Sequence, residues 1–320
     1  GTAYVLLHHA FGEVNGKKGV WGHAVGGMGA ISDAIAEAAQ SHGADIETGA
    51  EISDVLIEHD RAAGVELKDG RVVRARVIAA NMTLKRLYTE LVAKDTLSPA
   101  FSERMEHFKY GSGTFRMNVA LSGLPNFKCL PGVDPGDHHG AGIIIAPSLD
   151  YMDRAYRDAR DRGWSSEPVI EMLIPSTIDP TLAPPGAHVA SLFCQHVAPA
   201  LPDGRSWDEA RDEVANLMIA TVDRYAPGFA KSVIAHQILS PLDLDRTFGL
   251  TGGDIFHGQL SLNQLFSARP ALGYAAYRGP IKGLYHCGSG AHPGGGVTGA
   301  PGHNAAHAIL RDLKPFSFFS

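Results

Sequence analysis

The sequence has little cysteine, no long apolar run and no block of like charge, and each shortage excludes a class of protein. Its three cysteines, Cys129, Cys194 and Cys287, are far apart and form no CxxC pair, which argues against a disulfide framework and a thiolate metal site. No stretch approaches the ~20 apolar residues that a membrane-spanning helix needs. The 34 acidic and 28 basic residues are spread along the chain, with a net charge of -6. We therefore expect small-molecule chemistry and no nucleic-acid partner.

Signatures of several enzyme classes are also missing. The chain has no GxSxG nucleophile elbow and no Walker loop, so serine hydrolysis and phosphoryl transfer lose their usual motifs. His303 and His307 are four residues apart on a predicted helix, but Asn304 stands where a zinc protease requires glutamate, and we expect no metal site. Redox chemistry carried out by a bound cofactor remains.

The hydrophobic pattern predicts an α/β arrangement at both ends of the chain and an antiparallel sheet between them. Helices are expected at residues 30–42, 150–161, 207–225 and 301–313. Strands are expected at residues 44–47, 52–58, 63–68, 72–79, 114–121, 142–146, 169–175, 188–196, 233–240 and 283–287. Ser206 and Glu209 have the spacing of a capping box. We expect the first and last parts of the chain to share one sheet.

Glycine is abundant, and its 37 residues concentrate at 22–29 and at 288–302, each time before a predicted helix. The first cluster contains Gly27-x-Gly29-x-x-Ser32, one residue short of a dinucleotide-binding motif. A tight turn that contacts the edge of a cofactor or substrate is favoured there, and a nucleotide loop or a purely structural turn remain alternatives. The second cluster stands between a strand and a helix, which is typical of backbone that faces a ligand; a surface loop is the alternative.

These segments resemble a known family. The sequence HPGGGVTGAPGHNAAHAI resembles the C-terminal FAD motif of phytoene-dehydrogenase-like flavoproteins of the amine-oxidase superfamily. The segments YVLLHHAFGE, WGHAVGGMGAISDAIA, GGDIFHGQLSLNQLFSARP and GLYHCGSGAHPGGGV resemble, more closely, the pyridine nucleotide-disulfide oxidoreductase domain-containing proteins. The resemblance implies α/β plus α+β architecture, with a partial Rossmann-like FAD/NAD(P)-binding domain (1–82 and 281–320) and an antiparallel-sheet substrate domain (83–280).

The resemblance also implies which residues contact FAD. The family's N-terminal GxGxxG unit does not occur here, so we expect a C-terminal fragment that does not necessarily bind FAD alone. The matched cofactor positions are Gly26, Gly27, Met28, Gly29, Ile52, Ala80, Asn81, Gly288, Ser289, His292, Pro293, Gly294, Gly295, Gly296 and Val297. His257 is a candidate contact to substrate or flavin, with a structural role as the alternative. No catalytic acid or base is implied.

The activity that follows from the resemblance is transfer of hydride or electrons from a lipophilic or unsaturated molecule to flavin. An apolar substrate cavity is expected near strand 110–120 and the GGDIFHG segment. Two alternatives stay open: a non-catalytic binding or scaffold protein that retains the fold, and a dehydrogenase that uses only nicotinamide. A homo-oligomer is also left open. The expected location is the cytoplasm in a bacterium, or the mitochondrion in a eukaryote.

Overall fold

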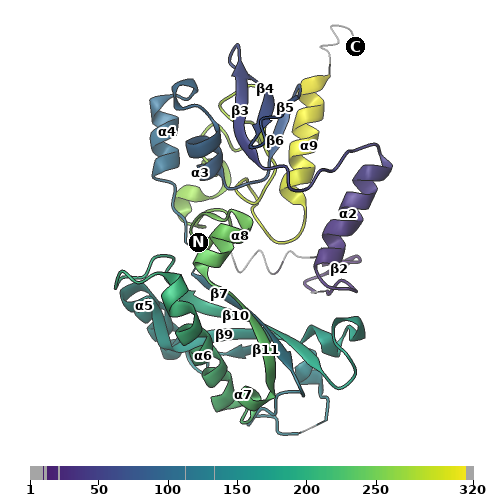
Figure 1. Ribbon diagram of the computed structural model, residues 1–320, viewed down its shortest axis with the longest axis vertical. Helices are drawn as coiled ribbons and strands as arrows, with labels where there is room; N and C mark the ends of the chain where they lie inside the picture. Colours follow the sequence, from purple (N-terminus) through teal and green to yellow (C-terminus); the bar gives the residue numbers. More distant parts are fainter. Residues whose placement is uncertain (1–9, 11–12, 21, 112, 133, 315–320) are drawn as a thin grey trace. The chain divides into compact units, whose positions relative to one another are not determined.

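The computed structural model describes residues 10, 13–20, 22–111, 113–132 and 134–314 (Figure 1). Most of the YVLLHHAFGE motif, at positions 4–13, lies outside the described residues. The chain divides into two compact units. Of the described residues, those within 47–111 and 245–314 form the first unit, and those within 10–46 and 113–244 form the second.

The first unit contains two small sheets. Strands β3 (Ile52–Glu58), β4 (Arg61–Leu67) and β5 (Val72–Arg74) form an antiparallel sheet in that order. Strands β6 (Ile78–Ala80) and β12 (Leu284–His286) pair in parallel. The prediction that the first and last parts of the chain share a sheet is confirmed, because β6 and β12 are about 200 residues apart and yet pair directly.

Short helices and one long helix complete this unit. They are α3 (Leu84–Arg86), the π-helical turn η1 (Leu87–Leu91), α4 (Pro99–Glu106) and α9 (Ala300–Leu313), while α8 (Pro241–Phe248) crosses the boundary of the division. The core joins Leu87, Tyr88, Phe101 and Met105 to Leu284 of β12. These apolar contacts explain why the segment after β6 belongs to the same compact unit as the end of the chain.

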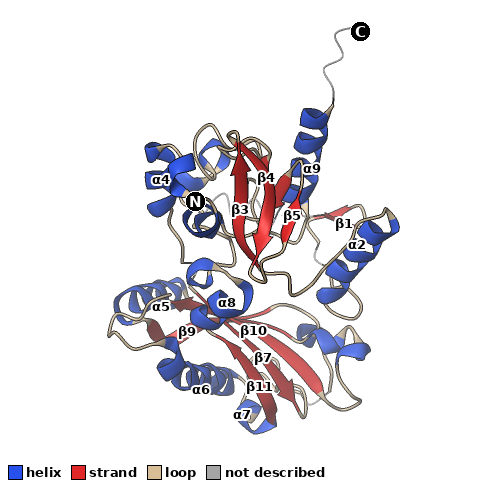
Figure 2. Cartoon of the chain, turned by 45° about the horizontal axis from the view of Figure 1, so that its top comes forward, coloured by secondary structure: helices blue, strands red, loops and turns tan. Residues whose placement is uncertain are grey.

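The second unit is built on a five-stranded antiparallel sheet, visible in Figure 2 as red arrows. Its order is β11-β7-β10-β9-β8, with bounds Val233–Leu239, Thr114–Leu121, His188–Val197, Trp164–Leu173 and Ile143–Ile145. The other elements are β1 (Glu13–Val14), β2 (Lys17–Lys18), α2 (Gly29–Ser41), α5 (Leu149–Arg162), α6 (Trp207–Tyr225) and α7 (Phe229–Ser232). The predicted antiparallel sheet is confirmed.

Helix α6 covers one face of this sheet because its apolar positions recur at helical spacing. Ala210, Val214, Met218 and Val222 are fully buried and belong to the same core as alternate residues of β7. The predicted capping box is confirmed, since the backbone amide of Ser206 donates to the Glu209 carboxylate at 2.7 Å.

Two predicted strands differ from the structure. Residues 44–47 form no strand. The segment 72–79 forms two strands rather than one, because β5 pairs antiparallel with β4 whereas β6 pairs in parallel with β12. A chain whose two ends hydrogen-bond to different sheets cannot stay a single strand.

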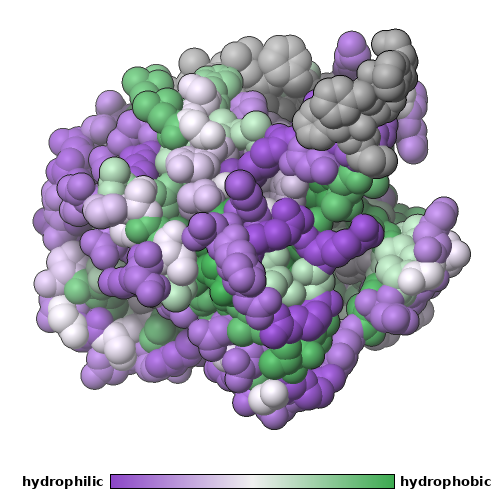
Figure 3. All heavy atoms as spheres, turned by 90° about the horizontal axis from the view of Figure 1, so that it is seen from above, coloured by the Kyte–Doolittle hydropathy of each residue, from purple (hydrophilic) through white to green (hydrophobic). Residues whose placement is uncertain are grey.

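The two compact units and the predicted domains have different boundaries. Residues 83–112 and 245–280 belong to the unit of β6 and β12, and α2 belongs to the unit of the antiparallel sheet. Which unit serves the cofactor and which the substrate stays a prediction. Within the described residues, no helix has both the length and the apolar character to cross a bilayer. On the face shown in Figure 3, hydrophilic residues separate scattered hydrophobic areas.

Candidate cofactor site

The second glycine cluster begins where the parallel pair of strands ends. Ala80 ends β6 and pairs with His286, which ends β12. The amide of Cys287 then donates to the carbonyl of Ala80 at 2.9 Å. Ligands of parallel sheets bind beyond the carboxyl ends of the strands. The structure therefore brings the predicted residues Asn81 and Gly288 to the edge where a ligand is expected.

Gly288 contacts the backbone of Asn81 so closely that no side chain fits. A Cβ atom on Gly288 would lie 2.2 Å from the carbonyl oxygen of Asn81 and 2.8 Å from its Cα. Real Cβ contacts are never this short, so glycine is required at this position by packing rather than by its backbone dihedrals. The close contact of these two segments holds the start of the glycine loop against the sheet.

The loop that follows presents unused backbone donors. Gly294 and Gly296 have φ of 98° and 140° and Val297 has φ of 57°, and Gly294 is buried whereas Gly296 and Val297 are exposed. No acceptor among the described residues pairs with the amides of Gly294, Gly295 and Gly296. Backbone amides without an acceptor ahead of a helix are suited to bind phosphate or carbonyl oxygens.

A buried arginine holds this loop, and the sequence analysis missed it. The side chain of Arg269 is fully buried. Its Nη2 donates to the carbonyls of Ser289 at 2.9 Å and Phe256 at 2.7 Å, and its Nη1 donates to the carbonyls of Gly258 and Gln264, both at 3.3 Å. One guanidinium thus joins the glycine loop to the segment that carries His257.

Asp254 and His257 lie in this second segment. The buried Asp254 carboxylate accepts hydrogen bonds from the amides of Gly111 at 3.0 Å and Phe256 at 2.9 Å, and burial raises its pKa. His257 has φ of 55°, and burial, with a smaller effect of Arg269, lowers its pKa. Its Nδ1 is buried without a partner among the described residues. The neutral imidazole therefore has one ring nitrogen without a partner in the described structure.

His292 is fixed from the other side of the loop. The hydroxyl of Tyr277 donates to the carbonyl of His292 at 2.8 Å and accepts from the Asn304 side chain of α9 at 2.8 Å. Burial lowers the pKa of His292, and its Nδ1 also lacks a partner among the described residues. Tyr277 thus connects the loop to the helix that follows it.

His286 is a third buried imidazole, and the sequence analysis missed it as well. It shares a hydrogen bond of 2.5 Å with the Tyr88 hydroxyl through Nε2, and its Nδ1 is buried without a partner in the described structure. Burial lowers its pKa to about 4, so the ring is neutral at pH 7. His286 ends β12 two residues before Gly288 and supports the loop from the core side.

The first glycine cluster lies in the other compact unit. The amide of Gly26 donates to the Asp179 carboxylate at 2.7 Å, and that of Gly27 donates to the carbonyl of Ala24 at 3.0 Å. Met28 is exposed and Gly29 begins α2. Ile52 is half-buried at the start of β3. Binding of a cofactor by Gly26, Gly27, Met28, Gly29 and Ile52 stays a prediction.

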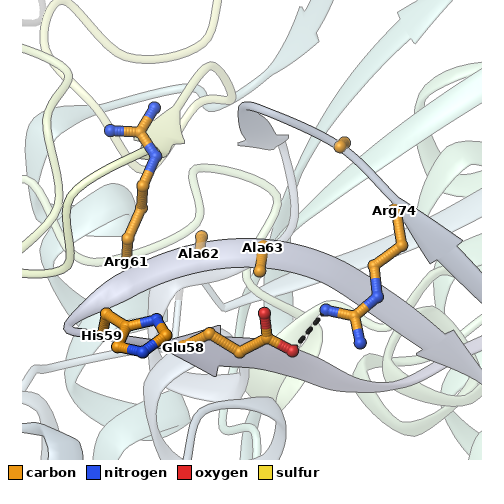
Figure 4. Close-up of a pocket in the computed structure, with 7 residues that line it drawn as sticks. Glu58, His59, Arg61, Ala62, Ala63 and Arg74 are labelled. Carbon is orange, nitrogen blue, oxygen red and sulfur yellow. Dashed lines mark hydrogen bonds and ion pairs between the residues drawn. The ribbon is translucent and has the colours of Figure 1, made fainter.

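Two surface cavities in the first unit are separate from the predicted site. One of about 380 Å³ is lined by Glu58, His59, Arg61, Ala62, Ala63, Arg74 and Ala75. Figure 4 shows Arg74 paired with Glu58 there, while Arg61 points away from that pair. The other, of about 230 Å³, is lined by residues that include Arg61, Arg278 and Lys282. Neither includes a predicted site residue, so neither contributes to the cofactor site.

The residues at the glycine loop fit a flavin dinucleotide. Gly288 lets the chain cross the sheet edge closely, the loop offers unpartnered amides, and two predicted histidines present buried ring nitrogens without partners in the described structure. Buried polar atoms are normally hydrogen-bonded, so the unpartnered ring nitrogens support the prediction of a ligand here.

Known proteins resemble the chain along nearly its whole length. No family model matches the chain. It is 45% identical to pyridine nucleotide-disulfide oxidoreductase domain-containing protein 2 of Mus musculus, over 98% of the chain and 55% of that protein. It is 24% identical to a lycopene-forming phytoene desaturase of Pseudescherichia vulneris, over 98% of the chain and 60% of that enzyme. The chain thus spans a little over half the length of the curated relatives it matches.

Solved structures share the fold at low sequence identity. An oxidoreductase from Methanosarcina mazei superposes with a TM-score of 0.58 at 18% identity, over 90% of this chain and 55% of that one. Putrescine oxidase bound to putrescine superposes with a TM-score of 0.55 at 16% identity, over 90% of this chain and 54% of that one. The shared architecture is a partial Rossmann-like flavoprotein fold. In sequence, the chain is thus similar to the pyridine nucleotide-disulfide oxidoreductase domain-containing proteins and, more distantly, to phytoene desaturases, as its motifs predicted.

Proposed function

We propose that the protein is an FAD-dependent oxidoreductase that passes hydride or electrons from a lipophilic or unsaturated small molecule to flavin. The observation that carries the proposal is the contact of Gly288 with Asn81 at the carboxyl ends of β12 and β6, followed by a loop with unpartnered amides. The sequence relatives named phytoene desaturases support the redox chemistry and an unsaturated substrate.

The chain's own residues would bind and orient the cofactor. The amides of Gly294, Gly295 and Gly296 would donate to its phosphate or ring oxygens, and His257 and His292 would each present a neutral ring nitrogen. Arg269 keeps the Ser289 peptide in place and adds a positive charge in a dry environment. When bound, the flavin supplies the electron acceptor, and the protein provides orientation, dryness and electrostatics.

The test is to purify the intact protein and measure its flavin content. A yellow protein with about one FAD per chain, whose flavin is reduced anaerobically by an unsaturated substrate, supports the proposal. A colourless protein that cannot be reconstituted with FAD contradicts it and favours the non-catalytic scaffold. Titration with NAD separates the remaining alternative, because a dehydrogenase that uses only nicotinamide would bind NAD and not FAD.

A further inference from the structure

The face of the five-stranded sheet opposite α6 carries polar side chains at its centre. Residues alternate between the two faces of a strand. Phe115, Met117, Val119 and Leu121 of β7 belong to the core with α6, so Arg116 and the other even-numbered residues point to the opposite face. On that face, α5 contacts the sheet at Val169.

The register of the strands defines one row across this face. Arg116 of β7 pairs with Leu239 of β11 and with Phe193 of β10. Phe193 pairs with Glu171 of β9, which pairs with Ile144 of β8. Arg116, Phe193 and Leu239 are half-buried, whereas Glu171 and Ile144 are exposed. The row therefore combines a guanidinium and, two strands away, the Glu171 carboxylate with an aromatic ring and two aliphatic side chains.

Arg116 uses few of its donors. Its Nη2 donates to the Ser191 hydroxyl at 3.0 Å, and its guanidinium carbon lies 5.3 Å from the centre of the Phe193 ring. No carboxylate among the described residues forms an ion pair with Arg116. Glu171 accepts instead from the Gln195 side chain at 2.5 Å. Because a guanidinium has five N–H donors, most of those of Arg116 are left for another acceptor.

Neighbouring polar groups on this face are already paired. The Asn118 side chain donates to that of Gln237 at 3.1 Å. An apolar molecule that covered the row would remove water from Arg116 without replacing its hydrogen bonds, which is costly for a charged group. A carboxylate over Arg116 would instead form charge-assisted, bidentate hydrogen bonds.

From this row we propose that the substrate carries a carboxylate, which Arg116 binds, and that its apolar part lies against Phe193 and Leu239, which flank Arg116. This inference rests on the proposed function, because the bound acid is a substrate only if the protein is an oxidoreductase. It deepens that function by naming a class of substrate. It narrows the expected substrate from a lipophilic or unsaturated small molecule to an amphipathic acid. Arg116 is then a residue that determines specificity, by discriminating acids from uncharged analogues of the same chain length.

The test measures the affinities of decanoate and decanol for the intact protein by titration calorimetry. We expect decanoate to bind roughly ten- to a hundredfold more tightly than decanol, because hydrogen bonds to a charged group contribute about 1.5 to 3 kcal/mol. Arg116→Met should abolish this preference while leaving the affinity for decanol unchanged. Arg116→Lys should keep part of the preference, and it serves as the test if Arg116→Met does not fold.

Two control variants locate the effect. Arg154→Met removes a cation from α5, where Arg154 faces Glu167 at 3.4 Å on the exposed surface, and should change neither affinity. Glu171→Gln removes the negative charge two strands from Arg116 and should leave the binding of decanoate equal or tighter. Equal affinities of the two ligands for the native protein, or an unchanged preference in Arg116→Met, would overturn the inference.

Flavin content is measured on the same preparations, so that the two proposals fail separately. A protein that binds FAD but shows no preference for decanoate keeps the proposed function and loses the carboxylate. A protein without flavin that still prefers decanoate through Arg116 keeps the anion site and loses the redox function.

Discussion

The two glycine clusters look alike in the sequence, but they have different surroundings in the structure. Each precedes a helix. A Cβ atom on Gly29, the first residue of α2, would meet nothing within 4 Å, and α2 has no buried residue. A Cβ atom on Gly288 would overlap Asn81, and α9 buries Ala305 and Ala308. Glycine content predicts a turn, but only the tertiary contacts show which turn is crowded.

The largest difference between the two clusters is expected when one methyl group is added to a glycine of each. Gly288→Ala forces the Asn81 backbone aside, and we expect a loss of more than about 4 kcal/mol in the free energy of unfolding. Gly29→Ala, the control, should stabilise the protein by up to about 1 kcal/mol because alanine favours a helix. Urea unfolding of both variants gives the comparison; equal effects would contradict it.

The next largest effect is expected at Arg269. Arg269→Met leaves four carbonyls without their donor, at about 1 kcal/mol or more each, so the free energy of unfolding should fall by about 4 kcal/mol. The matched control is Arg71→Met, because Arg71 pairs with Glu47 and Asp69 at 2.6 and 2.7 Å on the exposed surface. Exposed ion pairs contribute little. If the Arg269→Met protein were as stable as the Arg71→Met protein, the hydrogen bonds of Arg269 to the four carbonyls would be unimportant for stability.

A pH titration sharpens the comparison at the strand that leads into the second cluster. His286 has its pKa lowered to about 4 in the folded protein, whereas the unfolded chain binds the proton near pH 6.5. The unfolded state therefore takes up more protons between these values, and stability falls as pH falls. The loss should approach about 3 kcal/mol by pH 4.

Unfolding free energies measured from pH 7 to pH 4 check this dependence. In the variant His286→Asn, the slope of the unfolding free energy against pH should be smaller in this range by the contribution of about one proton. A slope identical in both proteins would mean that His286 does not carry it.

A smaller effect is expected from Tyr277→Phe. Removing the hydroxyl breaks the link from Asn304 to the carbonyl of His292, and we expect about 1 kcal/mol of destabilisation. Amide hydrogen exchange localises the effect: in the variant, the exchange rates of residues 292–297 should increase more than those of residues 26–29. Unchanged exchange in residues 292–297 would argue that the loop is held without Tyr277.

The sequence was informative where local periodicity decides the structure. Strand 114–121 and helix 207–225 match β7 and α6 residue for residue, and the capping box at Ser206 is present. The sequence also predicted Asn81 and Gly288 as site residues, although not their mutual contact. Arg269 and His286 were missed because their partners are remote: Ser289 is 20 residues from Arg269, and Tyr88 is 198 residues from His286. No local pattern encodes such pairs.

The polar row on the second sheet was also unexpected. An apolar cavity near strand 110–120 was predicted, and β7 does carry four fully buried apolar residues. They face the core with α6, so the face available to a ligand carries Arg116 and Asn118 instead. Strand alternation was visible in the sequence, but which face a helix would cover was not.

Amide hydrogen exchange of the intact protein with and without FAD tests the central claim most directly. If the loop after β12 binds the cofactor, FAD should slow the exchange of the amides of residues 288–297, including those of Gly294, Gly295 and Gly296, which have no acceptor in the described structure. FAD binding that left the exchange of residues 288–297 unchanged would contradict the account.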